Sequence, residues 1–369
     1  MKIDDKTSHN SPSLRFPEFN GEWKNTTLEE CVDFLDGQRK PIKSDDRKGE
    51  KRLYPYYGAS GIIDYIDEYI FDGDYILLSE DGANIIDRNY RVAFIANGKI
   101  WVNNHAHVLQ PHKEMNINFL SEALERINYA IYNTGTTMPK LNQEICRKIN
   151  LNVPSLSEQN KIGNLLYLLN ERIATQNRLI EDLKKLRCAV SNKLFQSVKG
   201  VVIPLSGISN IVKGKQINGD FLADVGEYYV MNGGTEPSGY YDNYNVEANT
   251  ISISEGGNSC GYVQFNRMPF WSGGHCYTIQ DIVSDVETLY LYHYLKSKEE
   301  SIMELRIGTG LPNIQKKDLA EFKVIIPAIE QQRTISNILS LLERKTEVEG
   351  RMLIAMRTEK QYLIHQMFI

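Results

Sequence analysis

Two stretches of the chain carry the hydrophobic pattern of long amphipathic helices. One follows Pro154 and the other follows Pro327, and in both stretches apolar residues recur every three or four positions with no internal proline. This spacing is typical of a helix rather than a strand. Each stretch has about 40 residues, which corresponds to about 60 Å at a rise of about 1.5 Å per residue. The sequence therefore predicts two long helices.

The apolar positions of the two predicted helices form a seam like that of a coiled coil. A helix of this length extends beyond a globule of roughly 130 residues, which favours antiparallel pairing of the two helices. Pairing of this kind would hold two globules at opposite ends of a rod, at a constant separation. The alternative, in which each helix packs on its own globule, stays open. The seam residues expected to bind the other helix or partner chains are Ile162, Leu169, Ile173, Ile180, Leu183, Ile335, Leu342 and Met352.

The chain contains an internal duplication. Matching blocks lie about 175 residues apart and keep the same order, and His105 pairs with His275 between them. Chance would not preserve the order and the spacing together, so the signal indicates two copies of one unit. The matched blocks are Tyr54–Ser60 with Tyr229–Thr235, Ser79–Gly82 with Ser254–Gly257, and Gly135–Leu141 with Gly308–Ile314.

The first part of each copy reads as a mixed globule. Short β-type runs such as Tyr75–Leu78 and Thr250–Ser254 are separated by turn signals that include Asp72-Gly73 and Asn97-Gly98. The predicted fold class is α+β, with two tandem, pseudo-symmetric mixed α/β globules separated by two long helices that form an antiparallel coiled coil. The predicted domains are an N-terminal arm over 1–21, globules over 22–153 and 199–326, and helices over 154–198 and 327–369.

Composition and charge narrow the classes of protein. The 369 residues are 41% hydrophobic, enough for sizeable cores, and the formal charge of −5 argues against a protein that coats nucleic acid by bulk charge. The five cysteines are odd in number and include no CxxC pair, so neither a disulfide framework nor a zinc site is expected. We expect a reducing, cytoplasmic location, because the sequence shows no signal-peptide pattern and no membrane-spanning run.

Catalytic motifs are missing from the sequence. It has no Walker A loop, no GxGxxG after a strand, no GxSxG elbow and no HExxH. His105, His107 and His112 could in principle form a metal site, but the second copy lacks suitable ligands, so ordinary strand and turn roles are preferred. The Ser79–Gly82 turn is acidic, yet the second copy has glycine in place of Asp81, and a solvated turn is expected. We therefore predict no catalytic residue, no metal and no enzymatic activity of the chain alone.

A local excess of basic residues indicates nucleic-acid binding. Seven of the fifteen residues from Gln38 to Arg52 are Lys or Arg, and a tyrosine cluster follows, although a solvated loop is the alternative. Small polar residues after each tyrosine block could approach base edges. The predicted DNA-binding residues are Arg39, Lys40, Lys43, Arg47, Lys48, Arg52, Tyr57 and Ser60 in the first copy, and Lys213, Lys215, Asn232 and Thr235 in the second.

Several motifs together resemble the specificity subunits of type I restriction–modification systems. They are the opening Pro12–Phe19 followed by Glu22-Trp23, the Gly-Thr-Thr-Met-Pro and Gly-Thr-Gly-Leu-Pro loops, and the Glu-Gln helix starts after Pro154 and Pro327. The resemblance implies that each globule is a target recognition domain that reads one half of a bipartite double-stranded DNA site. It implies that the helices are spacer regions that set the gap and dock two methyltransferase subunits.

The resemblance also assigns the chemistry to other chains. Endonuclease/translocase subunits would join the complex, and S-adenosylmethionine, ATP and Mg²⁺ would bind to partner subunits rather than to this chain. Three other hypotheses are a half-sized specificity subunit that dimerises, a non-enzymatic repeat scaffold or adaptor without DNA specificity, and a standalone enzyme. The presence of both copies in one chain argues against the first, and the missing motifs argue against the last.

Overall fold

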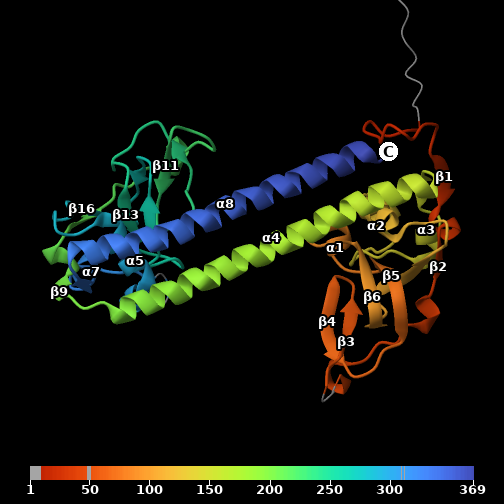
Figure 1. Ribbon diagram of the computed structural model, residues 1–369, viewed down its shortest axis with the longest axis horizontal. Coiled ribbons are helices and arrows are strands. Elements are labelled where there is room, and N and C mark those ends of the chain that lie inside the picture. The colour runs from red at the N-terminus through yellow and green to blue at the C-terminus, as the bar shows by residue number, and fades with distance from the viewer. Residues whose placement is uncertain (1–9, 48–50, 309, 311) are drawn as a thin grey trace, which may run out of the picture. The chain divides into compact units, whose positions relative to one another are not determined.

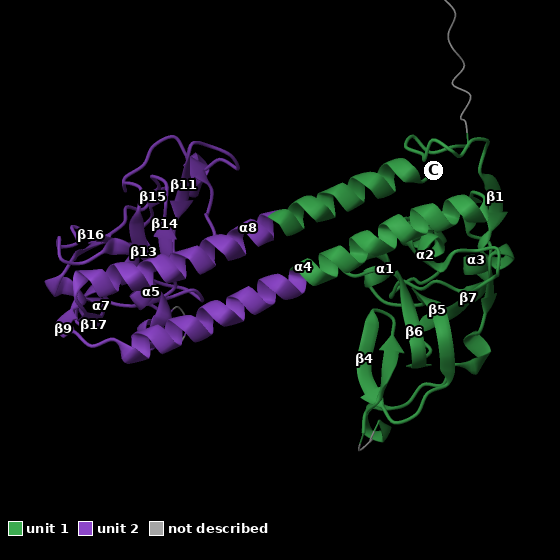
Figure 2. Ribbon diagram, viewed as in Figure 1, with its two compact units in different colours: residues 1–176, 352–369 green, residues 177–351 purple. Residues whose placement is uncertain are grey.

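The computed structural model describes residues 10–47, 51–308, 310 and 312–369 (Figure 1). The chain divides into two compact units, Met1–Gln176 with Met352–Ile369, and Asn177–Arg351 (Figure 2). Each unit combines a globule of strands and short helices with parts of two long helices, α4 (Leu156–Ser197) and α8 (Ile329–Met367). The predicted α+β class with two globules and two long helices is confirmed.

The globule of unit 1 is built on a mixed sheet with the strand order β2-β7-β5-β6-β3-β4. The paired strands are antiparallel except β3 and β6, which are parallel. A second small sheet pairs β1 with β8. The strands are β1 (Lys24–Thr27), β2 (Val32–Phe34), β3 (Tyr54–Gly58), β4 (Gly61–Ile66), β5 (Phe71–Ser79), β6 (Ala93–Val102), β7 (Ala106–Pro111) and β8 (Asn150–Val153), and the short helices are α1 (Asn84–Asp87), α2 (Ile117–Glu125) and α3 (Gln143–Arg147).

The globule of unit 2 repeats this topology with one interruption. Its sheets have the orders β10-β16-β13-β14, β12-β11-β15 and β17-β9. Strand β6 of unit 1 corresponds to two shorter strands, β14 and β15, because Pro269 lies between them and a proline has no N–H for a ladder. The elements are β9 (Val201–Pro204), β10 (Asn210–Lys213), β11 (Tyr228–Met231), β12 (Tyr240–Tyr241), β13 (Thr250–Ser254), β14 (Val263–Asn266), β15 (Trp271–Ser272), β16 (Cys276–Gln280), β17 (Lys323–Ile326), α5 (Thr288–Ser297), α6 (Glu299–Met303) and α7 (Lys316–Ala320).

Two glycine turns predicted for unit 1 lie inside strands instead. Asp72-Gly73 belongs to β5 and Asn97-Gly98 belongs to β6, and Gly73 is directly opposite Gly98 in the ladder. Both glycines have positive φ, 150° and 73°. The facing glycines let two paired strands adopt a backbone that other residues rarely tolerate, so the signal marks an irregularity within the sheet rather than its end.

The long helices run antiparallel where they meet. In unit 1 the start of α4 shares an apolar cluster with the end of α8, through Ile162 and Met367. In unit 2 the later part of α4 contacts the early part of α8, where Arg187 Nη1 lies 3.2 Å from Glu343 Oε1. The expected antiparallel pairing is confirmed. Among the described residues, no helix is both long enough and apolar enough to cross a membrane.

The ends of both helices also belong to the globule cores. Ile162 and Ile335, which the sequence analysis assigned to a seam for the other helix or for partner chains, are 1% and 3% exposed. Ile162 packs with Trp23 and Phe119, and Ile335 lies in the main core of unit 2. Both predicted packing modes therefore occur along each helix, and these two isoleucines are not available to a partner chain.

A buried glutamine attaches the start of each long helix to its globule. Gln159 Oε1 accepts a hydrogen bond from Asn116 N at 2.9 Å, and Gln332 Oε1 accepts one from Glu287 N at 2.8 Å. Each glutamine also donates to the carbonyl of the proline that precedes its helix. The Glu-Gln helix starts found in the sequence are thus structural attachments.

We predict that Gln332→Leu destabilises unit 2 by about 1–3 kcal/mol, because the fully buried amide of Gln332 accepts from the half-buried Glu287 N–H and donates to the buried Pro327 carbonyl, and both bonds are lost. The exposed neighbour Gln331 provides a matched control, since Gln331→Leu should change the free energy of unfolding by less than about 0.5 kcal/mol. Urea unfolding followed by circular dichroism measures both values. Equal effects of the two substitutions would contradict the attachment.

Candidate nucleic-acid interface

Loop cluster 1 is the set of unit 1 segments 58–60, 79–82, 103–105 and 135–141, which hydrogen bonds hold together. Ser79 Oγ donates to Ala59 O at 2.5 Å and fixes the loop after β3. Glu80 then connects two more segments through its main chain, because its N–H donates to His105 O at 2.9 Å and its carbonyl accepts from Leu141 N at 2.7 Å. Four loops distant in sequence therefore form one surface.

Loop cluster 2 repeats these bonds in unit 2, with segments 232–235, 254–257, 273–275, 307–308 and 312–314. Ser254 Oγ donates to Gly233 O at 2.6 Å. The N–H of Glu255 donates to His275 O at 2.9 Å, and its carbonyl accepts from Ile314 N at 2.8 Å. Thr309 and Leu311 lie outside the described residues. The duplication seen in the sequence thus encodes two copies of one loop scaffold.

The Gly-Thr-Thr-Met-Pro segment forms a tight loop that requires its glycine. A Cβ atom on Gly135 would lie 1.8 Å from the carbonyl oxygen of Met138, so no other residue fits without movement of the backbone. The loop is anchored by Gly82 N, which donates to Pro139 O at 3.0 Å, and the matched bond in unit 2 joins Gly257 N to Pro312 O at 3.0 Å. The motif thus holds a fourth loop against each cluster.

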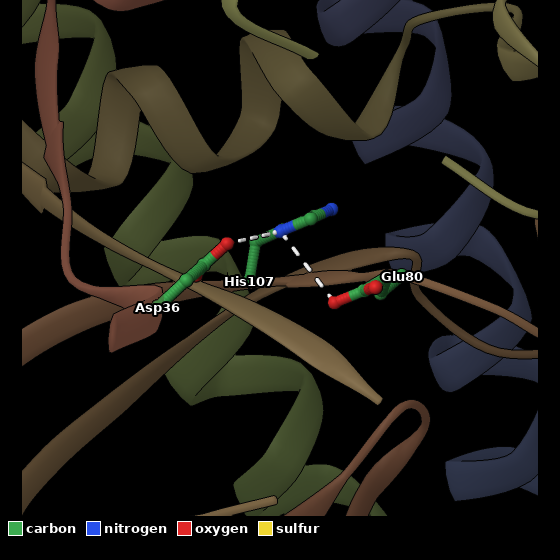
Figure 3. Close-up of side chains that lie close together, drawn as sticks. All are labelled: Asp36, Glu80 and His107. Atoms are coloured by element: carbon green, nitrogen blue, oxygen red, sulfur yellow. Dashed lines mark hydrogen bonds and ion pairs between the residues drawn. The ribbon is translucent and has the colours of Figure 1, made fainter. Parts of the chain in front are cut away.

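A network of charged side chains lies beneath loop cluster 1 (Figure 3). Arg39 Nη1 lies 2.7 Å from Glu80 Oε2 and also donates to Ala106 O. His107 is buried, and its Nδ1 lies 2.6 Å from Asp36 Oδ2. The solvated turn predicted at Ser79–Gly82 is therefore wrong for its first half, because Ser79 is buried and the Glu80 carboxylate is paired inside the globule.

Asp36, Glu80 and His107 lie close enough together to hold a metal ion by geometry alone. Their donor atoms, however, already have partners. The Arg39 guanidinium contacts both carboxylates, and Lys140 Nζ lies 3.4 Å from Glu80 Oε1. Both ring nitrogens of His107 face oxygens, since Nε2 lies 2.9 Å from Leu141 O, so the ring offers N–H groups rather than a lone pair. The arrangement fits an ion-pair network better than a metal site.

The His107 ring is held in its charged form. Burial is the largest single influence on His107 and lowers its pKa, but the hydrogen bonds and charge interactions with Asp36 and Cys146 together outweigh it, and the pKa rises to about 10. Burial likewise raises the pKa of Asp36, but the bond and charge of His107, the Val108 N–H and the nearby Arg39 together outweigh it, so the pKa of Asp36 is lowered overall. The pair is therefore ionised at neutral pH.

Unit 2 builds the same network with different chemistry. Lys213 Nζ lies 2.5 Å from Glu255 Oε1 and takes the part of Arg39. Tyr277 takes the part of His107, because its hydroxyl lies 3.0 Å from Glu255 Oε1 and 3.2 Å from Ile314 O. Burial raises the pKa of Tyr277 well above its ordinary value, so this ring is a neutral donor. A neutral phenol thus occupies the place of an imidazolium.

The basic residues between Gln38 and Arg52 fall into two groups, some held inside the globule and others exposed. Arg39 belongs to the buried network, and the Arg47 guanidinium lies 4.6 Å from the centre of the Tyr56 ring. Lys40 and Lys43 are exposed, and Arg52 is exposed with a loose pair to Asp64 at 3.5 Å. Lys48 lies outside the described residues. Lys40, Lys43 and Arg52 are therefore exposed where a ligand could reach them, whereas Arg39 and Arg47 are held against internal partners.

A tryptophan anchors the basic segment in each copy. Trp101 Nε1 donates to Lys40 O at 2.6 Å, and Trp271 Nε1 donates to Lys215 O at 2.9 Å. The side chains of both lysines are exposed. The distribution of Lys and Arg gives no sign of this hydrogen bond from the indole. The two tryptophans do occupy matched positions in the repeat, and that match could have indicated it.

The four predicted base-contacting residues differ in their surroundings. Ser60 and Thr235 are exposed at the tips of their loops. Tyr57 is half-buried and stacks on Phe94, with ring centroids 6.1 Å apart. Asn232 Oδ1 accepts from His275 N at 3.1 Å and so supports the loop. Ser60 and Thr235 could therefore contact a ligand, whereas Tyr57 and Asn232 interact with Phe94 and His275 inside the protein.

We predict that His107 makes the stability of unit 1 depend on alkaline pH. Its folded-state pKa of about 10 lies above the ordinary value of 6.5, so its contribution is complete below about pH 6.5 and is lost as the pH rises through about 10. The melting-temperature difference between the wild type and His107→Gln should therefore shrink between about pH 7 and pH 10. A difference that stays constant over this range would refute the charged pair.

A known protein family matches both copies of the repeat. The model of the type I restriction modification DNA specificity domain matches residues 20–185 and 198–355. A putative type I restriction enzyme specificity subunit of Haemophilus influenzae is 28% identical over 366 residues, which cover 92% of this chain and 93% of the relative. A putative type I specificity subunit of Mycoplasma pneumoniae is 31% identical over 166 residues, 44% of this chain and 44% of the relative.

The fold is shared with a solved structure. The crystal structure of the type I restriction–modification system S subunit from M. genitalium has a TM-score of 0.78 and 21% sequence identity, and the match covers 97% of this chain and 99% of that chain. Because the family model matches both copies, the expectation of a non-catalytic subunit is confirmed. The chain belongs to the specificity subunits of type I restriction–modification systems.

Proposed function

We propose that this chain reads a bipartite double-stranded DNA target, with one half-site for each loop cluster. One observation carries the proposal: the two clusters share their main-chain scaffold, but the side chains displayed on it differ. Asp81 and Asn104 in unit 1 are replaced by Gly256 and Gly274 in unit 2. A constant scaffold that carries variable side chains suits two readers of different base sequences.

The surroundings of the clusters support contact with DNA. Lys40 is exposed beside cluster 1 and Lys215 beside cluster 2, where either could meet a phosphate while small loop residues approach base edges. The net charge of −5 leaves the rest of a basic channel to other chains of a complex. The side chains at the loop tips, rather than the whole surface, would therefore determine which bases each cluster recognises.

The long helices would serve as the spacer and as the docking surface. Exposed apolar side chains occur at matched positions of the two helices, with Leu168 at 56% and Leu341 at 65% exposure. Leu179 and Met352 form a second matched pair, at 40% and 44%. These residues, rather than the buried Ile162 and Ile335, are the contacts that we propose for two methyltransferase subunits, which endonuclease/translocase subunits would join. S-adenosylmethionine, ATP and Mg²⁺ would be bound by those partners.

We predict that the two globules can be exchanged independently. Replacing residues 22–153 with the equivalent segment of a relative should change one half-site and leave the other half-site and the gap unchanged, because each cluster is built within its own unit. Methylome sequencing of cells that express the chain with its methyltransferase measures the outcome. A protein that folds and assembles but has lost both half-sites would count against the proposal.

We also predict that Lys40→Ala and Lys215→Ala weaken binding to all DNA sequences about equally. Each should lower the slope of log affinity against log salt by about one unit if one phosphate contact is lost. Lys113, which is exposed beyond the end of β7, is a matched control whose removal should leave the slope unchanged. Binding titrations at several salt concentrations give the slopes, and unchanged slopes for both variants would exclude these lysines as phosphate contacts.

A further inference from the structure

Loop cluster 1 displays an exposed histidine that is held unusually firmly. The His105 side chain is 49% exposed, yet its Nδ1 lies 2.9 Å and 2.8 Å from the two carboxylate oxygens of Asp81. Its main chain is fixed on both sides, since its N–H donates to Asn103 Oδ1 at 2.8 Å and its carbonyl accepts from Glu80 N at 2.9 Å. The ring is therefore presented to solvent in one orientation.

Loop cluster 2 displays a histidine in the same way. His275 is 63% exposed, its N–H donates to Asn232 Oδ1 at 3.1 Å, and its carbonyl accepts from Glu255 N. Its Nδ1 lies 3.6 Å from Glu255 Oε2, a buried oxygen that has no hydrogen-bond partner among the described residues. The carboxylate comes from the residue before Gly256, the counterpart of Asp81, so the pairing persists although the acid has changed position.

The two rings share one chemical capability. Nδ1 of His105 is hydrogen-bonded to the Asp81 carboxylate, and Nδ1 of His275 lies 3.6 Å from the Glu255 carboxylate. In both rings Nε2 is the nitrogen left for a ligand, and in the protonated ring Nε2–H is a charge-assisted donor. Among the described residues, Nε2 of neither ring has a hydrogen-bond partner. Two nearby lysines already have acidic partners: Lys140 pairs with Glu80 at 3.4 Å and Lys213 with Glu255 at 2.5 Å. An outward N–H of this kind suits an anionic oxygen.

The repeat distinguishes a phosphate from a base as the partner. The residues beside each histidine differ between the clusters, as Asn104 and Gly274 do, whereas the histidine itself is the same. Two half-sites of different sequence share the sugar–phosphate backbone but not their base edges. Contacts to phosphate fix the register of a protein on DNA and carry no sequence information, so an invariant residue on a variable surface fits that role.

We propose that His105 and His275 are a matched pair of phosphate contacts, which set the register of the two loop clusters on their half-sites. This inference rests on the proposed DNA-reading function and deepens it. Each imidazole donates Nε2–H to a phosphate oxygen, while the opposite nitrogen is bonded to Asp81 in His105 and faces Glu255 in His275. Both histidines act as positioning contacts in this scheme, and the loop tips read the bases.

The test uses the full chain assembled with its methyltransferase subunits. Binding to target and unrelated duplexes is measured over a salt series at one constant pH of about 6. His105→Ala and His275→Ala should each weaken binding to both duplexes roughly tenfold and lower the salt slope by about one unit. His105→Lys should restore the slope, because a cation at the same place can still meet the phosphate.

His112 supplies the control within unit 1. It lies just beyond the far end of β7 from His105 and its Nε2 is 3.4 Å from Asp33 Oδ1, so it is also an imidazole beside a carboxylate. His112→Ala should leave affinity and salt slope unchanged. A melting curve for each variant shows whether the fold is retained.

Three outcomes would overturn the inference. Loss of preference at one half-site with an unchanged salt slope would identify a base contact. A lowered melting temperature without any change in DNA affinity would identify a purely structural histidine. Variants that match the wild type in every respect would exclude any role. The proposed function itself would fail differently, since the wild-type complex would then show no preference for its target duplex over the unrelated one.

Discussion

A carboxylate placed at the end of a central strand, Glu80 in unit 1 and Glu255 in unit 2, is the interaction on which each loop cluster depends. Its main chain bonds two neighbouring loops, and its side chain accepts from a cation that lies near the basic segment. The side chains of Glu80 and Glu255 are 14% and 11% exposed, and a carboxylate so far removed from water is stable only when such partners offset its desolvation. The charge and the loop geometry are therefore maintained together.

The two copies show which part of this network is constrained. The constant features are a cation on the glutamate and a ring donor directed at the carbonyl of Leu141 or Ile314. The chemistry of the ring is free, because an imidazolium paired with Asp36 and a neutral phenol both satisfy the carbonyl. A scaffold that tolerates such an exchange beneath the loops can also tolerate changes at their tips, which is what a reader of variable sequences requires.

The sequence predicted the features that repeat along the chain and missed those that depend on distant residues. Hydrophobic periodicity was sufficient for the long helices, and the repeat was sufficient for two α+β globules. The turn at Ser79–Gly82 was misjudged because Glu80 is neutralised by Arg39, which lies in a different segment. The prediction of turns at Gly73 and Gly98 was wrong for a similar reason. The two glycines face each other in a strand pair, and that pairing depends on residues distant in sequence. Nothing local in the basic run separates the internally paired Arg39 from the exposed Lys40.

The long helices are attached to the globules through shared hydrophobic cores. In unit 1, Phe368 near the end of α8 stacks on Phe119 with ring centroids 5.1 Å apart, so the first globule is attached to the last helix as well as to α4. In unit 2, Phe195 near the end of α4 packs on Tyr290 and Tyr294 of the second globule. Each globule is therefore held by both helices through aromatic core contacts. Within its own unit, a loop cluster could therefore change its orientation on the adjoining helix ends only by unpacking that core.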